Sequence, residues 1–443
     1  MGDALATAIM SQIGSMTPQP QLKRAIGRWS LAALAVNTTL GSAIFGLPSV
    51  LAGAVGNASP LAVLLGGLAM VVIVSCYAEV ASQFTDSGGS YLYVRYTFGR
   101  LAGIEVGWLN LVTRFSAYGA AVNLFVLYLG EFFPDIGHPV PRFMVITGLV
   151  GSLAIVNYRG VTGGTLVSNV SVVAKLLPLL VLSVVGVGFL LMHPPHLAVA
   201  SSQADAAGWF KAILLLFFAY GGYETTLISG GEARDPRKDA PFALFVSLAV
   251  IALLYTVLQL IVVAVLPDPA HSERPLADVA RVLIGGPGAA LVAVGALISV
   301  FGFLSAYLLT ASRSMYSLAE HGDFPAAFAA VHPRFRTPHV SIALFGLLIW
   351  AFALLGSFSW NATLSAVGRL GYYVAVCAAV PVLRRRQPEA ARFRLRGGML
   401  LPILGVLICV VLLTRVDYSK SLILAATVGV GLLNWLWVRK KVP

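Results

Sequence analysis

Residues 31–51 read LAALAVNTTLGSAIFGLPSVL and residues 209–228 read WFKAILLLFFAYGGYETTLI, and these two apolar stretches decide the fold. Each is long enough to cross a bilayer as a helix, which takes about 20 apolar residues. Each is also interrupted near its middle, by Gly41-Ser42-Ala43 in the first and by Ala219-Tyr220-Gly221-Gly222 in the second. Because lipid offers no hydrogen-bond partners, broken backbone at membrane depth is tolerated only beside a cavity or inside protein. Matching breaks in two halves of a chain therefore point to the substrate site of a secondary transporter.

The composition is that of a membrane protein. The 443 residues are 58% hydrophobic and only 11% charged, and the mean hydropathy is +0.86. A soluble domain of this length cannot bury so much apolar surface. Cys76, Cys377 and Cys409 all lie in apolar stretches and have neither a disulfide pattern nor metal-ligand spacing. We therefore expect no cofactor and no metal.

Windows of about 20 apolar residues predict an all-α polytopic membrane protein with twelve transmembrane helices. The expected spans are residues 29–54, 60–83, 101–133, 142–158, 164–192, 209–230, 241–266, 288–318, 338–356, 358–383, 398–414 and 419–438. With the N-terminus placed inside, cytoplasmic segments carry 21 of the 30 Lys and Arg residues and outer segments carry six. This bias predicts a multi-pass protein of the cell membrane with both termini cytoplasmic.

The same orientation accounts for the net charge of +12, so nucleic acid is not expected as a partner. Lipid binding by the basic segment Arg384–Arg396 is a secondary interpretation of part of that charge.

The two breaks divide the chain into two sets of five expected helices. We expect residues 1–28 to form a cytoplasmic N-terminal segment, 29–192 a first repeat, 209–383 a second repeat, and 398–438 two peripheral helices. An odd number of spans in each repeat gives the two repeats opposite orientations in the membrane, which predicts inverted repeats. Identity between the halves is not visible by eye, so this prediction depends on the breaks alone.

Short motifs are spread along nearly the whole chain. They are Gly41-Ser42-Ala43-Ile44-Phe45, Tyr77-Ala78-Glu79-Val80, Ser87-Gly88-Gly89-Ser90-Tyr91, Gly107-Trp108-Leu109-Asn110, Ala174-Lys175-Leu176-Leu177, Phe218-Ala219-Tyr220-Gly221-Gly222-Tyr223-Glu224, Asp235-Pro236-Arg237-Lys238, Ser312-Arg313-Ser314-Met315-Tyr316, Gly322-Asp323-Phe324-Pro325 and His332-Pro333-Arg334-Phe335. In this order they resemble amino acid permeases of the amino acid–polyamine–organocation (APC) superfamily. The resemblance implies the leucine-transporter fold, with ten core helices in two inverted repeats and two peripheral helices.

The breaks are the expected substrate site. Free N–H groups and the positive dipole end at the start of the second half-helix suit an amino acid carboxylate, and carbonyls freed at the breaks suit its α-ammonium. The predicted binding residues are Gly41, Ser42, Ala43, Phe218, Ala219, Tyr220, Gly221 and Gly222. The alternative is that small residues here only allow close helix packing. The resemblance implies that an aromatic at Phe218 or Tyr220 covers the substrate, and core packing is the alternative.

The first break departs from the resembled family at Ala43, where those permeases carry Gly. The extra methyl group narrows the pocket or stiffens the turn, so the size of the substrate stays open.

Lys175 and Glu224 are the expected proton-coupling residues. A lysine among apolar neighbours in a span is costly unless it is paired or neutral, and such an amine can take up and release a proton. The resemblance implies that Lys175 stands where sodium-coupled relatives hold a cation, near the carbonyls of 38–40 and hydroxyls such as that of Ser305. We hypothesise that it carries a proton or acts as a fixed charge; snorkelling to the interface is the alternative.

The acidic residue beside the second break has three interpretations. Glu224 could protonate, attract a cationic substrate, or stabilise the break as a hydrogen-bonded carboxylate. Arg114 is expected to pair structurally. Arg369 is expected to pair with Glu224 or Glu79, or to lie at the outer mouth of the pathway.

The predicted function is secondary active transport of amino acids by alternating access. Proton symport is favoured by Lys175, and exchange of substrates without net proton coupling is the alternative. A non-transporting sensor is a remote alternative, and an enzyme is not expected because the spans hold only scattered charges. Glu224 leaves cationic amino acids or polyamines open as substrates, whereas the apolar walls suit neutral ones. The oligomeric state is not predicted.

Overall fold

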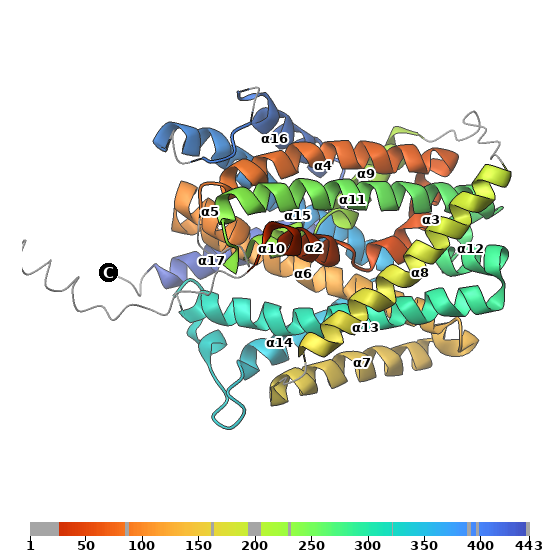
Figure 1. Ribbon diagram of the computed structural model, residues 1–443. Helices are drawn as coiled ribbons and strands as arrows, with labels where there is room; N and C mark the ends of the chain where they lie inside the picture. The colour runs from red at the N-terminus through yellow and green to blue at the C-terminus, as the bar shows by residue number, and fades with distance from the viewer. Residues whose placement is uncertain are drawn as a thin grey trace, which may run out of the picture.

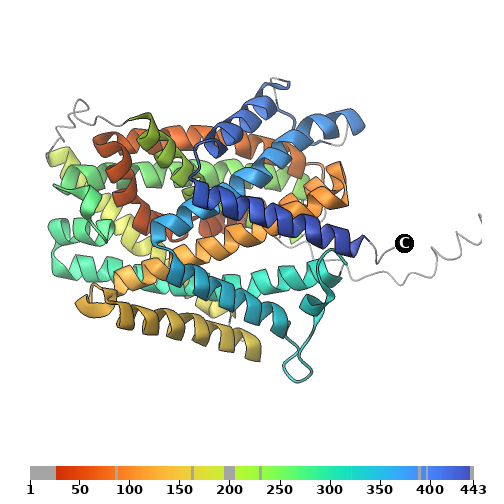
Figure 2. The same ribbon diagram turned by 180° about the vertical axis from the view of Figure 1, so that it is seen from behind.

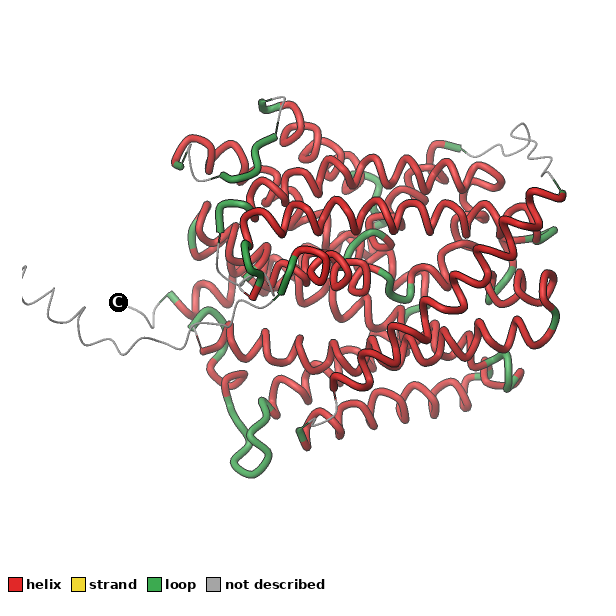
Figure 3. Tube along the Cα trace, viewed as in Figure 1, coloured by secondary structure: helices red, strands yellow, loops and turns green. Residues whose placement is uncertain are grey.

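The computed structural model describes residues 26–84, 88–160, 164–193, 205–228, 232–320, 322–387, 391–395 and 398–439. The expected N-terminal segment 1–28 therefore lies almost entirely outside the described residues. In the described part the protein is a bundle of helices without strands (Figure 1). The tube in Figure 3 shows the same arrangement, with loops at the two ends of the bundle and short non-helical segments within it.

Most of the helices lie at the positions of the expected spans. Their bounds are α2 (Arg28–Thr39), α3 (Ala43–Val55), α4 (Ser59–Ala81), α5 (Gly89–Phe98), α6 (Arg100–Leu129), α7 (Pro139–Arg159), α8 (Gly164–Met192), α9 (Ala206–Ala219), α10 (Tyr223–Ile228), α11 (Pro236–Val265), α12 (Pro275–Ile284), α13 (Gly286–Glu320), α14 (His339–Leu355), α15 (Phe358–Arg386), α16 (Leu400–Leu413) and α17 (Tyr418–Val438). Two of the helices, α5 and α12, lie in connections to which the sequence analysis assigned no structure.

Length and hydropathy identify nine helical runs in the described residues that are able to cross a membrane. One of these runs, Ala43–Ala81, contains both α3 and α4, which a short 3-10 turn at Gly56–Ala58 separates. The apolar helices α14 and α16 are shorter, with 17 and 14 residues. The chain is thus a multi-pass membrane protein, and the number twelve stays a prediction.

The centre of the bundle is α6. In the most apolar 18-residue segment of α6, 78% of the residues are buried inside the protein. The corresponding shares are 17% for α7 and 22% for α17. It packs along α15 and against α5, α13, α14 and α17. On the other side of the bundle α11 packs along α4 and α2. Figure 2 shows α17 and α16 lying on the outside of the bundle, and α7 forming one edge.

Both expected breaks are present. The backbone leaves helical geometry between Thr39 and Ala43 and again between Ala219 and Tyr223. Gly222 has a φ of 122°, a conformation that favours glycine. A Cβ on Gly222 would lie 2.5 Å from the Thr38 carbonyl oxygen, so glycine also allows the second break to touch the first. The two interrupted helices therefore meet at their breaks.

Candidate substrate site

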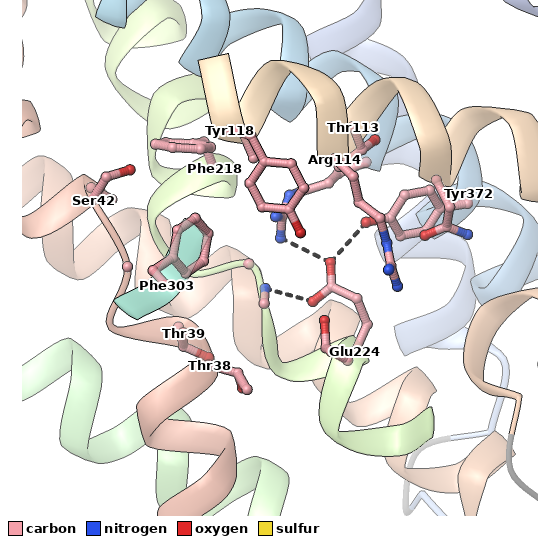
Figure 4. Close-up of a pocket in the computed structure, with 18 residues that line it drawn as sticks. Thr38, Thr39, Ser42, Thr113, Arg114, Tyr118, Phe218, Glu224, Phe303 and Tyr372 are labelled. Atoms are coloured by element: carbon pink, nitrogen blue, oxygen red, sulfur yellow. Dashed lines mark hydrogen bonds and ion pairs between the residues drawn. The ribbon is translucent and has the colours of Figure 1, made fainter. Parts of the chain in front are cut away.

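A cavity of about 50 Å³ lies where the breaks meet, which is room for several waters at about 10–15 Å³ each (Figure 4). It is lined by residues from both breaks and from three other helices. They are Thr38, Thr39, Gly41, Ser42, Ala43, Asn110, Thr113, Arg114, Ala117, Tyr118, Phe218, Gly221, Gly222, Glu224, Thr225, Phe303, Arg369 and Tyr372. The expected residues Gly41, Ser42, Ala43, Phe218, Gly221, Gly222 and Glu224 all belong to this lining, whereas Ala219, Tyr220 and Lys175 do not.

The first break presents the N-terminus of α3 to the cavity. Gly41 N donates to the Thr39 carbonyl (2.7 Å), which turns the chain. Ser42 is the N-cap of α3, and its side chain makes no capping bond. Because the first amides of a helix have no partner inside the helix, those at the start of α3 are donors available to an anion.

The second break is held by a carboxylate. Glu224 Oε2 accepts a 2.6 Å bond from Gly222 N. Glu224 Oε1 accepts bonds from Arg369 Nη1 (2.8 Å), Tyr372 Oη (2.7 Å) and Tyr373 Oη (3.2 Å). Figure 4 shows the carboxylate between the backbone of the break and the side chains that bind it. Glu224 and Arg369 are each only 8% exposed, so this is a buried, hydrogen-bonded ion pair.

The partner of Arg369 is thus Glu224 and not Glu79. The Glu79 carboxylate accepts from Arg384 Nε (2.6 Å) and Nη2 (2.7 Å), and from the backbone N–H of Leu395 (2.9 Å). Glu79 therefore ties α4 to the end of α15 and to the connection that follows, away from the cavity.

Lys175 lies behind the first break rather than in the cavity. Its Nζ donates to the carbonyls of Asn37 (2.7 Å) and Leu40 (2.9 Å), in the last turn of α2 and at its end. The side chain is 7% exposed, so it does not snorkel to the interface. No hydrogen bond joins it to Ser305 in the part of the chain that the structure describes. The amine thus donates hydrogen bonds to two carbonyls that have no partner within the helix because α2 ends there.

Of the two aromatics expected to cover the substrate, Phe218 lines the cavity and Tyr220 points away from it. Tyr220 Oη donates to the Val63 carbonyl on α4 (2.8 Å), and its ring lies 5.7 Å from that of Tyr255. Ala219 is also turned aside, where its carbonyl accepts from Tyr255 Oη (3.2 Å). These residues join the end of α9 to α4 and α11.

Helix α6 also lines the cavity, which was not predicted from the sequence. The residues concerned are Asn110, Thr113, Arg114, Ala117 and Tyr118. Thr113, Arg114 and Ala117 follow Asn110 by three, four and seven residues, a spacing that places them on one face of a helix. This polar face on an otherwise apolar span is a sequence signal that could have identified them. Phe303 of α13 and Tyr372 of α15 had no such local signal.

Aromatic side chains before and after the second break pack on other rings. The rings of Phe218 and Phe358 lie 6.4 Å apart, and a Cβ on Gly46 would lie 2.6 Å from Phe358. Tyr223 stacks on Tyr373, with ring centroids 6.2 Å apart, and both lie near Tyr77.

Comparison with known proteins finds relatives along the whole chain. A family model described as "Amino acid permease" matches residues 26–427. The chain is 26% identical to the branched-chain amino acid permease BcaP of Bacillus subtilis, over 98% of this chain and 97% of that protein. It is 26% identical to the serine/threonine exchanger SteT of the same organism, over 87% and 89%. It is 28% identical to the large neutral amino acids transporter small subunit 2 of Mus musculus, over 93% and 79%.

Proposed function

The chain belongs to the amino acid permease family, and from that premise we propose that it is a secondary active amino acid transporter working by alternating access. The observation that carries the proposal is the cavity between two touching helix breaks, where Gly222 lies against the Thr38 carbonyl. Breaks of this kind are where transporters of this architecture bind substrate. The relatives described as an amino acid permease and as a serine/threonine exchanger support the same class of substrate.

In the proposed binding mode, the α-carboxylate of the substrate occupies the N-terminus of α3 at Ser42 and Ala43. Its α-ammonium lies among the carbonyls at the ends of α2 and α9. The free N–H groups and the positive dipole end at the start of α3 support the first contact, and the C-terminal ends of α2 and α9 at the two breaks support the second. Phe218 would then lie over the bound substrate.

Lys175 is the residue we propose for coupling. Its amine bonds the Asn37 and Leu40 carbonyls, so a change in its protonation would loosen the end of α2 beside the substrate site. This arrangement supports proton symport. Exchange remains the alternative, because a lysine that stays charged would act only as a fixed support of the break. For Glu224, the four bonds to its carboxylate favour the structural interpretation over proton transfer.

For the membrane arrangement, we propose twelve spans in two inverted repeats of five, followed by α16 and α17. The positive-inside bias supports cytoplasmic termini and a cytoplasmic position for the Arg384 end of α15. The broken helices, α4 and α11 would rock as one unit against the rest. Their mutual packing, with α11 against α4 and α2 and α4 against α9, supports that grouping.

The test is a thermal-shift screen of the purified full-length protein against all amino acids and common polyamines. A ligand that binds the folded state stabilises it by about 2.7 kcal/mol at 100 times its Kd. We expect at least one amino acid to raise the melting temperature and to be taken up by proteoliposomes. If no amino acid or amine did either, the proposed function would be wrong.

A further inference from the structure

The charges that line the cavity are unbalanced. Arg114, Arg369 and Glu224 are the ionised side chains in the lining, which gives two guanidinium groups against one carboxylate. Glu224 is already engaged by Arg369 (2.8 Å). Among the described residues, no carboxylate lies within salt-bridge distance of Arg114, which comes from α6, the helix that packs along α15. The substrate site thus carries one positive charge in excess.

Three residues of the same lining carry buried hydrogen-bond donors without a partner among the described residues. The Nε of Arg369 is buried and has no partner in the described part of the protein. The same holds for the hydroxyl groups of Thr39 and Thr113, which line the same cavity. Leaving a buried donor without a partner costs free energy, and more when the donor is charged. These donors are therefore free to bind an acceptor that a solute brings with it.

The charge of the solute decides how well it fits. A neutral amino acid is a zwitterion, which leaves the excess positive charge in place, and a cationic side chain increases it. A second carboxylate cancels it, and carboxylates are the acceptors that guanidinium groups bind best. Among the described residues that line the cavity, Glu224 is the acidic group that could attract a cationic side chain, and it is already paired with Arg369.

We propose that the cavity selects amino acids whose side chain ends in a carboxylate, which Arg114 and the Nε of Arg369 bind, and that it rejects cationic side chains. This inference rests on the proposed transport function and names the substrate class of the same site. The α-carboxylate remains at the start of α3, and the side-chain carboxylate points toward α6 and α15.

The test compares aspartate with asparagine, which differ in charge and hardly in size, and adds one larger neutral and one cationic amino acid. Uptake of labelled L-aspartate, L-asparagine, L-leucine and L-lysine is measured for the full-length protein in proteoliposomes. A charge-assisted bond of about 1.5–3 kcal/mol corresponds to a ten- to hundredfold preference, so we expect the KM for aspartate to be at least about tenfold below that for asparagine. Lysine should be neither taken up nor inhibitory.

Variants of Arg114 assign the preference. Arg114→Gln should bring the aspartate and asparagine KM values close together, and Arg114→Lys should keep part of the difference. Arg159→Gln, a change of the same type at an exposed position on α7, should alter neither value.

Two results would overturn the inference and leave the proposed function standing. One is uptake of leucine or asparagine by the wild type with no uptake of, or competition by, aspartate. The other is an unchanged aspartate-to-asparagine ratio in Arg114→Gln. If the wild type takes up no amino acid at all, the proposed function fails and this inference fails with it. The comparison of substrates in the wild type needs no variant. It therefore tests the inference even if the Arg114→Gln protein folds poorly.

Discussion

Arg369 occupies the space that a side chain at Gly221 would fill, since a Cβ on Gly221 would lie 1.4 Å from Arg369 Nη1. The small residue in the second break thus has a specific purpose, because it lets a guanidinium from α15 reach Glu224 on α10 at 2.8 Å. The break, the ion pair and the cavity depend on one another.

Gly221→Ala should separate the ion pair. The Arg369 head group can move aside to accept the methyl group, but it then leaves Glu224. Losing one partner of a buried pair costs about 3–5 kcal/mol. We expect a lower melting temperature and loss of amino acid uptake. Gly148→Ala is the matched control, because a Cβ at Gly148 on α7 has no neighbour within 4 Å. Equal behaviour of the two variants would contradict the account.

Gly222→Ala should be more harmful than Gly221→Ala. Here a Cβ would meet the backbone carbonyl of Thr38 at 2.5 Å, which cannot rotate away as a side chain can. The φ of 122° adds backbone strain for any residue with a Cβ. We expect the larger drop in melting temperature and no uptake. A variant that retained wild-type uptake would show that the breaks do not need to touch.

Glu224 and Arg369 should be energetically coupled. In a double-mutant cycle, Glu224→Gln and Arg369→Met each leave a buried group without its partner, whereas the double variant leaves neither charge. The double variant should therefore lose less stability than the sum of the single variants, by about 0.5–3 kcal/mol. Melting temperatures in one detergent give the comparison. Additive losses would mean that the pair contributes no coupling.

Lys175→Met should remove the response of uptake to a proton gradient. The variant keeps the apolar stem and removes the amine that bonds the Asn37 and Leu40 carbonyls. We expect uptake driven by an imposed pH gradient to fall to the level measured without a gradient. Lys211→Met, at an exposed position, is the control. Full, pH-dependent uptake by Lys175→Met would rule out Lys175 as the proton carrier.

Ala43→Gly should widen the pocket. Ala43 lines the substrate cavity and also a small neighbouring gap beside Leu47 and Tyr255, so removal of its methyl group adds space at the start of α3. We expect uptake of glutamate relative to aspartate, and of leucine relative to alanine, to rise. Unchanged ratios would show that Ala43 does not limit substrate size.

The breaks could be predicted from the sequence to within about a residue, because glycine and small polar residues grouped inside an apolar stretch mark where a spanning helix is most easily interrupted. The direction of individual side chains could not. Tyr220 and Ala219 belong to the predicted break, yet the turn of the backbone points them toward α4 and α11. The partner of Arg369 also stayed open, since a contact between positions 224 and 369 depends on how α10 and α15 pack.

Helices α5 and α12 were missed for a different reason. Each has only 10 residues and lies in a connection between spans, so neither gives a window of about 20 apolar residues. The buried face of α12, which includes Leu276 and Val279, is an amphipathic pattern that a hydropathy window does not detect.

The central claim is that an amino acid binds between the two breaks. The most direct measurement is a cryo-electron microscopy map of the full-length protein saturated with an amino acid identified in the thermal-shift screen. The account predicts density in the cavity, with the α-carboxylate within hydrogen-bond distance of the backbone amides at Ser42 and Ala43 and with Phe218 over the ligand. An empty cavity, or a ligand bound elsewhere in the bundle, would contradict it.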